Sequence, residues 1–116
     1  MGKTRIAIGR WGRLHEEYLM DSYPDKINKL DEEGELESYL TDVDKRAQKM
    51  MESLIEDLCQ KEGVDINDYD PLNDIVSEGI SILAEENVLN AIVYNSAVIV
   101  IVKFGKKRLA RYRRME

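Results

Sequence analysis

Apolar residues recur at helical spacing through most of the chain. The longest series places seven side chains three or four residues apart, so that all of them share one stripe of a helix. Its members are Leu36, Leu40, Val43, Ala47, Met50, Leu54 and Leu58. We therefore expect a helix over residues 35–62. Gly34 precedes it and Gly63 ends it, since glycine adopts without strain the positive φ that often closes a helix.

Two shorter helices are expected before this one. Trp11, Leu14, Tyr18 and Leu19 recur at helical spacing and predict a helix over residues 12–22. Pro24 prevents its uninterrupted continuation because proline lacks an amide donor and crowds the preceding turn. A second helix over residues 24–33 follows, with Pro24 near its start and Gly34 at its end.

A fourth helix is expected from Asp70-Pro71 to about Tyr94. A carboxylate cap followed by proline is a strong helix start. The apolar residues after it predict one broad buried face: Leu72, Ile75, Val76, Ile80, Leu83, Val88, Leu89, Ile92 and Val93. Gly79 either weakens this helix or lets a neighbouring segment approach closely.

These patterns predict a mostly α-helical bundle of about four helices. Residues 1–94 would form an acidic helical domain with a short basic N-terminal arm, and residues 95–116 an apolar and then basic extension. Residues 97–104 are rich in β-branched side chains and fit either a strand, paired with residues 5–8, or a continuation of the helix. The stripe from Leu36 to Leu58 also fits a seam between two copies of the chain, although one helix of a bundle is the preferred interpretation.

Size and composition are those of one globular domain. The chain has 116 residues, 43% hydrophobic and 34% charged. A single cysteine, Cys59, excludes an intramolecular disulfide and favours a reducing compartment. The longest apolar run has six residues, far below the ~20 needed to span a bilayer, and the N-terminus lacks a signal-peptide pattern. We expect a cytoplasmic protein with no membrane partner.

Charge is unevenly distributed along the chain. Residues 1–13 carry a net charge of +4, residues 14–102 carry −16 and residues 103–116 carry +6. An acidic body of this kind attracts basic protein surfaces and repels nucleic acid, whereas the two basic ends have the opposite preference.

Catalytic and metal-binding patterns are missing. His15 is followed by two glutamates, but the second histidine of a zinc motif would fall at position 19, which is Leu19. A calcium loop counted from Asp65 lacks its central glycine and its final glutamate. We interpret His15 as a polar side chain on an amphipathic helix, Cys59 as a buried structural thiol and the aspartates near Asp65 as a helix-capping turn. We expect no enzyme activity, no cofactor and no metal.

Three stretches resemble one known family. They are WGRLHEEYL at residues 11–19, GELESYLTDVDKRAQKMMESLIEDLCQKEGV at residues 34–64 and AEENVLNAIVY at residues 84–94. Over about residues 9–94 the sequence resembles the TnpV family of small proteins encoded in bacterial transposons and other mobile elements. The resemblance implies a mobile-DNA setting, in which small acidic proteins often assist a transposase or inhibit host defence as anti-CRISPR proteins do.

Our leading hypothesis is a non-enzymatic protein that binds a Cas nuclease or a transposase through exposed acids and modulates or inhibits it. The acids predicted to contact the partner are Asp42, Asp44, Glu52, Glu56, Asp57, Glu85 and Glu86. The alternative is a nucleic-acid-binding accessory protein that uses its basic ends. Its contact residues would be Arg10, Arg13, Lys106, Lys107, Arg108, Arg111, Arg113 and Arg114. The basic tail equally fits folding against the protein's own acidic body, and a homo-oligomeric helical module is a further alternative.

Overall fold

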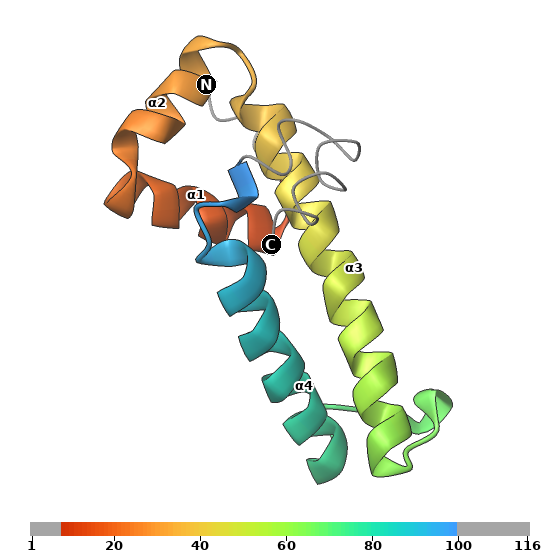
Figure 1. Ribbon diagram of the computed structural model, residues 1–116. Coiled ribbons are helices and arrows are strands. Elements are labelled where there is room, and N and C mark those ends of the chain that lie inside the picture. The colour runs from red at the N-terminus through yellow and green to blue at the C-terminus, as the bar shows by residue number, and fades with distance from the viewer. Residues whose placement is uncertain (1–7, 100–116) are drawn as a thin grey trace, which may run out of the picture.

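The computed structural model describes residues 8–99, and within them the fold is a small helical bundle without strands (Figure 1). The bundle contains α1 (Arg10–Ser22), α2 (Pro24–Glu32), α3 (Leu36–Glu62) and α4 (Ile75–Val88). A short 3-10 turn, η2 (Ile66–Asp68), precedes α4, and a π-helical turn, η3 (Leu89–Val93), follows it directly. The prediction of a mostly α-helical bundle of about four helices is confirmed.

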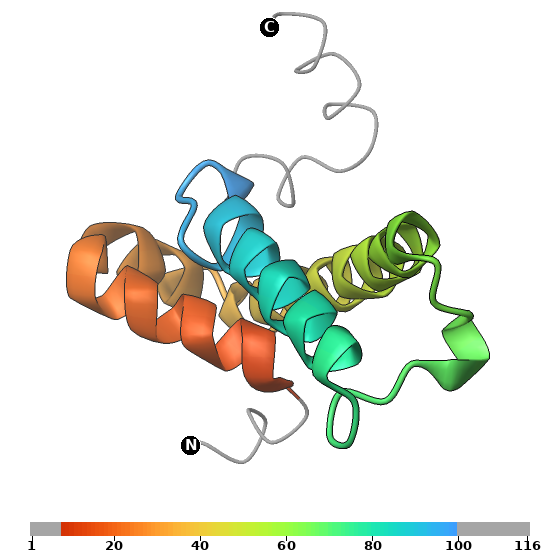
Figure 2. The ribbon, with the colours of Figure 1, turned by 90° about the horizontal axis from the view of Figure 1, so that it is seen from below.

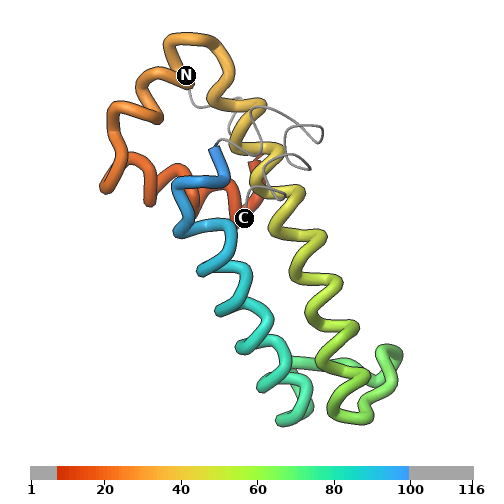
Figure 3. The backbone as a smooth tube through the Cα atoms, viewed as in Figure 1, coloured from red at the N-terminus to blue at the C-terminus, as the bar shows by residue number. Residues whose placement is uncertain are grey.

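The long helix α3 organises the bundle. Figure 1 shows α4 running back beside α3, while α1 and α2 lie around the opposite end of α3 from the α3–α4 connection. Seen from below, α4 lies between α1 and α3 (Figure 2). The tube in Figure 3 shows the last described residues, 94–99, returning to the region where α1 meets α3. One end of the molecule is therefore a packed bundle, and the other is an antiparallel pair of helices.

The expected helix boundaries hold for the first three helices. Pro24 occupies the first turn of α2, where its missing amide costs nothing. Gly34 closes α2 at φ 71°, and the Glu35 amide donates to the Leu30 carbonyl at 2.9 Å. Gly63 closes α3 at φ 73°, and the Val64 amide donates to the Cys59 carbonyl at 2.8 Å. Both glycines thus supply the left-handed residue of a helix-ending motif.

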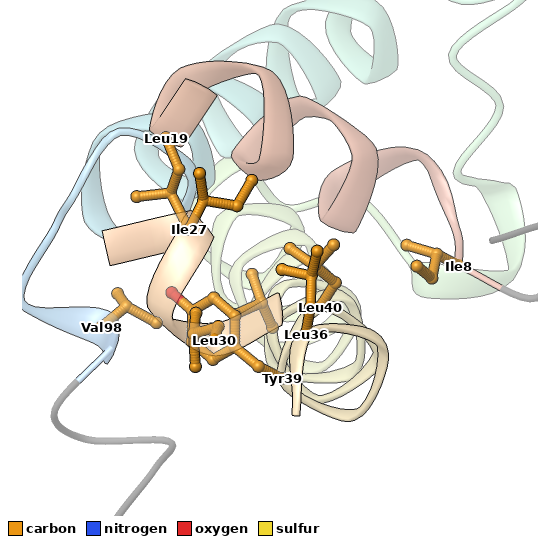
Figure 4. Close-up of a cluster of buried hydrophobic side chains, with 9 residues drawn as sticks. Ile8, Leu19, Ile27, Leu30, Leu36, Tyr39, Leu40 and Val98 are labelled. Atoms are coloured by element: carbon orange, nitrogen blue, oxygen red, sulfur yellow. The ribbon is translucent and has the colours of Figure 1, made fainter. Parts of the chain in front are cut away.

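The main core lies where α1 and α2 pack on the first half of α3. Figure 4 shows this cluster, which contains Ile8, Leu19, Ile27, Leu30, Leu36, Tyr39, Leu40, Val43 and Val98. A second cluster joins α1, α3, the end of α4 and η3 through Trp11, Ala47, Val88 and Val93. The first four positions of the Leu36 to Leu58 stripe are buried inside the chain, so they are not free to form a seam with a second copy.

The predicted start of the fourth helix is wrong by several residues. Asp70 forms a separate turn, in which its carbonyl accepts from the amides of Asn73 and Asp74. Asp74 is extended and caps α4, since its carboxylate accepts from the Ser77 amide at 2.9 Å. Ser77 in turn accepts from the Asp70 amide at 3.0 Å. Two capping aspartates stand four residues apart, and the second one begins the helix.

The predicted apolar face of α4 is also partly wrong. Ser77, Ile80, Ala84 and Val88 are buried, and the first and third of these were not in the expected set. Four residues of that set are instead exposed: Leu72, Ile75, Val76 and Leu83. The reason is that α4 packs mainly on α3 among the described helices, so a single narrow face of α4 is covered.

Two predictions lie wholly or mostly outside residues 8–99. The alternative of a strand or a helix at residues 97–104 concerns a segment of which residues 97–99 are described, and these are in a turn and the start of a helix. Its predicted pairing partner at residues 5–8 is described at Ile8 only, which is buried in the core.

No helix within residues 8–99 is long and apolar enough to cross a membrane.

Candidate functional site

A buried polar centre joins three elements at the crossing of α1, α3 and η3. His15 is completely buried on α1, at helical spacing from Trp11 and Leu19, which are buried on the same face. Its Nδ1 lies 2.6 Å from the Val93 carbonyl oxygen, and its Nε2 contacts the Tyr39 hydroxyl. The π-helical turn ends at Val93, where carbonyls have no partner within the helix, so the imidazole satisfies one of them.

These contacts define the protonation of the ring. A carbonyl can only accept, so Nδ1 carries the proton and donates to Val93, while Nε2 accepts from the Tyr39 hydroxyl. Burial lowers the pKa of His15, and the bond to Val93 opposes that shift to a smaller extent. Burial also raises the pKa of Tyr39, which keeps its hydroxyl protonated and able to donate. The centre is therefore neutral, internally bonded and closed to a substrate from solvent.

Asp44 forms a second internal contact, between α3 and the start of α1. It is 5% exposed, and its Oδ1 accepts from the Gly12 amide at 3.0 Å. Its Oδ2 accepts from Gln48 Nε2 at 2.5 Å. The Gly9 N-cap has no side chain, so a carboxylate from another helix accepts from one of the free amides, that of Gly12, and faces the positive end of the helix dipole. Asp44 thus caps α1 across the bundle.

Six of the seven predicted protein-contact acids remain accessible, and one does not. The exposed ones are Asp42, Glu52, Glu56, Asp57 and Glu86. Glu85 is partly exposed and forms an ion pair with Arg10. The expectation that Asp44 is exposed is wrong, because Gly9 and Gly12 leave room for its carboxylate against the backbone of α1.

The predicted nucleic-acid contacts are mostly outside the described residues. Lys106, Lys107, Arg108, Arg111, Arg113 and Arg114 belong to that part. Arg10 is exposed but engaged, since it pairs with Glu85 and its guanidinium lies 4.6 Å from the centre of the Trp11 ring. Arg13 is exposed on α1. The structure therefore does not bring the two basic ends together as one described surface, and this alternative stays a prediction.

The aspartate-rich loop forms turns and caps. The Asp65 carboxylate accepts from the Asn67 amide at 2.9 Å, and Asp70 accepts from the Leu72 amide at 3.3 Å. This confirms the interpretation of an Asx-rich turn. Within residues 8–99 no group of three histidine, cysteine or acidic side chains is placed to hold a metal ion. Cys59 is a free, buried thiol, as expected.

Sequence reasoning missed the densest acidic surface. Five acids lie within seven residues where α2 turns into α3: Asp31, Glu32, Glu33, Glu35 and Glu37. All five are exposed, and α3 contributes no cation before Lys45. A running sum of charge along the sequence would have found this segment, whereas the predicted contacts were chosen individually from helix faces.

Comparison with known proteins places the chain in a family. A family model described as transposon-encoded protein TnpV matches residues 1–93. The match extends through all four helices and ends with η3, so it includes both His15 and its partner Val93. Neither the curated proteins nor the solved structures give a match. Because the family model covers most of the 116 residues, the chain belongs to the TnpV family of transposon-encoded proteins.

Proposed function

We propose that this protein is a non-enzymatic interaction protein that binds a nucleic-acid-processing enzyme through its acidic helical surface. The partner is a Cas nuclease or a transposase, which the protein modulates or inhibits, and an anti-CRISPR-like inhibitor is the sharpest form of the proposal. The family supports the mobile-element setting. The observation that carries the proposal is the charge of the folded body: residues 8–99 hold 22 acidic and eight basic residues, a net charge of −14.

A negative body fits the basic channels in which such enzymes hold nucleic acid. Complementary charge raises association rates and selects basic partners, and it disfavours direct contact with phosphate backbones. The two internal polar contacts agree with this proposal, because His15 and Asp44 are both buried and bonded within the protein. The exposed groups that remain available for binding include the carboxylates of Asp42, Glu52, Glu56, Asp57 and Glu86.

The test is binding of the full chain to purified Cas nucleases and to the transposase of the same element. Affinity should be measured at about 50 mM and about 300 mM salt, together with cleavage or strand-transfer activity. We expect binding at low salt that weakens at least tenfold at high salt, with loss of enzyme activity. Absence of binding to every such enzyme at low salt would contradict the proposal.

A pair of charge reversals separates a specific surface from total charge. Glu52 and Glu56 are exposed and lie four residues apart, so they share one side of α3. Replacing both with lysine should weaken binding at least tenfold. The matched control reverses Glu17 and Asp25, which are exposed on α1 and α2, and changes net charge equally. If both pairs weaken binding to the same extent, these α3 acids are not the contact surface.

A further inference from the structure

The first half of α4 carries a second apolar stripe, on the side facing away from α3. At 100° per residue, Gly79 lies opposite the buried residues Ser77, Ala84 and Val88. Around Gly79 stand four apolar side chains with large exposed fractions, namely Ile75 83%, Val76 45%, Ile82 59% and Leu83 45%. Leu72, which is 91% exposed, extends this stripe into the preceding turn. We call residues Leu72, Ile75, Val76, Gly79, Ile82 and Leu83 the outer α4 stripe.

Nothing among the described residues covers the outer α4 stripe. A Cβ atom added to Gly79 would meet no atom within 4 Å. Isolated exposed apolar side chains are ordinary on protein surfaces, but a contiguous stripe along two turns of a helix is typical of a contact surface. The bundle itself therefore leaves one apolar helix face available for a further segment.

The charges beside the stripe select its occupant. Glu78 and Glu86 are exposed, border the stripe and have no cationic partner within residues 8–99. Asp74 is exposed at its lower end. A second copy packed on the same face would bring acids against acids, which disfavours a symmetric dimer. The complementary occupant is an apolar segment that carries lysine and arginine.

This chain contains such a segment immediately after its last described residue. The sequence AVIVIVKF at residues 97–104 is apolar, and GKKRLARYRR at residues 105–114 is strongly basic. The path from Val93 back to Ile75 along the helix is 18 residues, or about 27 Å. Residues 100–116 reach about 56 Å when extended, which is long enough to reach Ile75, whereas a single helix of these residues would span only about 25 Å.

We propose that residues 100–116 dock on the outer α4 stripe of the same chain. Phe104, at most about 17 Å beyond Ile99, would contact the near end of the stripe at Ile82 and Leu83. Leu109 and Tyr112 would reach its far end, and Lys106 and its basic neighbours would face the acids of α4. Tethering favours this pairing, because a segment of the same chain has an effective concentration on the order of 1 mM at a site within its reach. A contact with an intrinsic Kd of about 0.1 mM would then be about 90% occupied. The tail and an external basic partner would compete for Glu86.

Photocrosslinking in the full chain tests this docking directly. Ile75 is replaced with p-benzoylphenylalanine, the protein is irradiated at about 5 µM, and crosslinked peptides from the monomer band are identified by mass spectrometry. We expect crosslinks from position 75 to residues 100–116. The same probe at Glu52, an exposed position on α3, is the matched control and should give at least tenfold fewer. The same photocrosslinking residue placed at Leu72 should also crosslink to residues 100–116, which shows that the result does not depend on one position.

Charge reversal in the same reporter chain identifies the cause. Lys106→Glu with Lys107→Glu should lower the crosslink yield at least fivefold, and adding Glu78→Lys with Glu86→Lys should restore it. The near-ultraviolet signal of Trp11, which is buried in the bundle, reports whether each variant is folded. Crosslinks found only in a dimer band, an equal yield from Glu52, or a yield unchanged by these substitutions would each overturn the proposal. Binding of a Cas nuclease or transposase is measured separately, so either proposal can fail without the other.

Discussion

Replacing Asp44 with alanine should destabilise the fold much more than any loss of a surface acid. Asp44 joins α3 to the start of α1 through the Gly12 amide, at 3.0 Å, and is 5% exposed. A carboxylate bonded to a buried amide contributes roughly 1.5–3 kcal/mol, and its charge at a helix N-terminus adds about 0.3–1 kcal/mol. Alanine regains about 0.5 kcal/mol of helix propensity within α3. The expected net loss is therefore about 1.3–3.5 kcal/mol.

Urea unfolding followed by Trp11 fluorescence measures this loss close to its origin. Trp11 is 7% exposed and precedes the amide that Asp44 binds, so its emission reports the packing of α1 on α3. Thermal unfolding provides a second measurement, in which the midpoint should fall by roughly 10 °C for a domain of this size. Asp44→Asn should lose about half as much, because the amide keeps an oxygen acceptor without the charge.

Asp42 provides the matched control on the same helix. It is exposed two residues earlier and has no bond to α1, so Asp42→Ala should change the free energy of unfolding by less than about 0.5 kcal/mol. If Asp44→Ala and Asp42→Ala gave the same unfolding midpoint, the cap across the bundle would be refuted. If Asp44→Ala weakened partner binding without changing stability, Asp44 would belong to the interface, as its sequence position first indicated.

Three further predictions concern the same packed end of the bundle. Gly12→Ala should lower stability by about 1–3 kcal/mol, because its Cβ would lie 2.7 Å from the Leu40 carbonyl oxygen. Gly34→Ala should cost about 1 kcal/mol through its φ of 71° alone, since no atom lies within 4 Å of the added Cβ, and Gly34→Asn should cost less. Tyr39→Phe should cost about 1–3 kcal/mol because His15 Nε2 loses its donor. Thermal unfolding measures all of these, and a neutral result for any one contradicts the contact assigned to it.

Stability should fall as pH is lowered from about 7.5 to 5.5. The pKa of His15 is lowered in the folded state. Below pH 6.5, the ordinary pKa of histidine, His15 is therefore protonated in the unfolded chain but remains neutral in the folded chain. The slope approaches about 1.4 kcal/mol per pH unit. His15 is the single histidine of the chain, so His15→Leu should remove this slope while lowering stability at every pH. Equal slopes in the two proteins would show that the imidazole is not the group responsible.

The first three helices were predictable because local sequence determines them. The stripe on α3 has a regular period, Pro24 separates α1 from α2, and Gly34 and Gly63 stand where a positive φ is required. Each of these signals acts within about four residues of its own position. These local signals therefore do not depend on how the rest of the chain packs.

The start of α4 was less predictable because two caps compete. Asp70 is followed by Pro71 and has the stronger local pattern, yet Asp74 begins the helix. The outcome depends on Ser77, which is completely buried and accepts from the Asp70 amide. Tertiary packing thus selected the second of two acceptable starts, and a pattern limited to neighbouring residues cannot report that choice.

The internal polar contacts were beyond local reasoning for the same reason. Val93 and Tyr39 lie 78 and 24 residues from His15, and Gly12 lies 32 residues from Asp44. A hint was present, since His15 stands midway between Trp11 and Leu19 at helical spacing on the buried face of α1. Only the fold, however, shows which acceptors and donors meet the buried ring.

Burial divides the acids of this protein into two groups with different consequences for mutation. Asp44 is buried and stabilises the bundle, so its loss changes the structure before it changes any interface. Asp42 and Glu56 are exposed, and their loss changes the surface potential with little effect on folding. A binding defect is therefore informative about the partner only when it arises from the second group. A net charge counted from the sequence does not distinguish buried acids from exposed ones. The interface must therefore be mapped by substituting exposed acids, with a stability measurement on every variant.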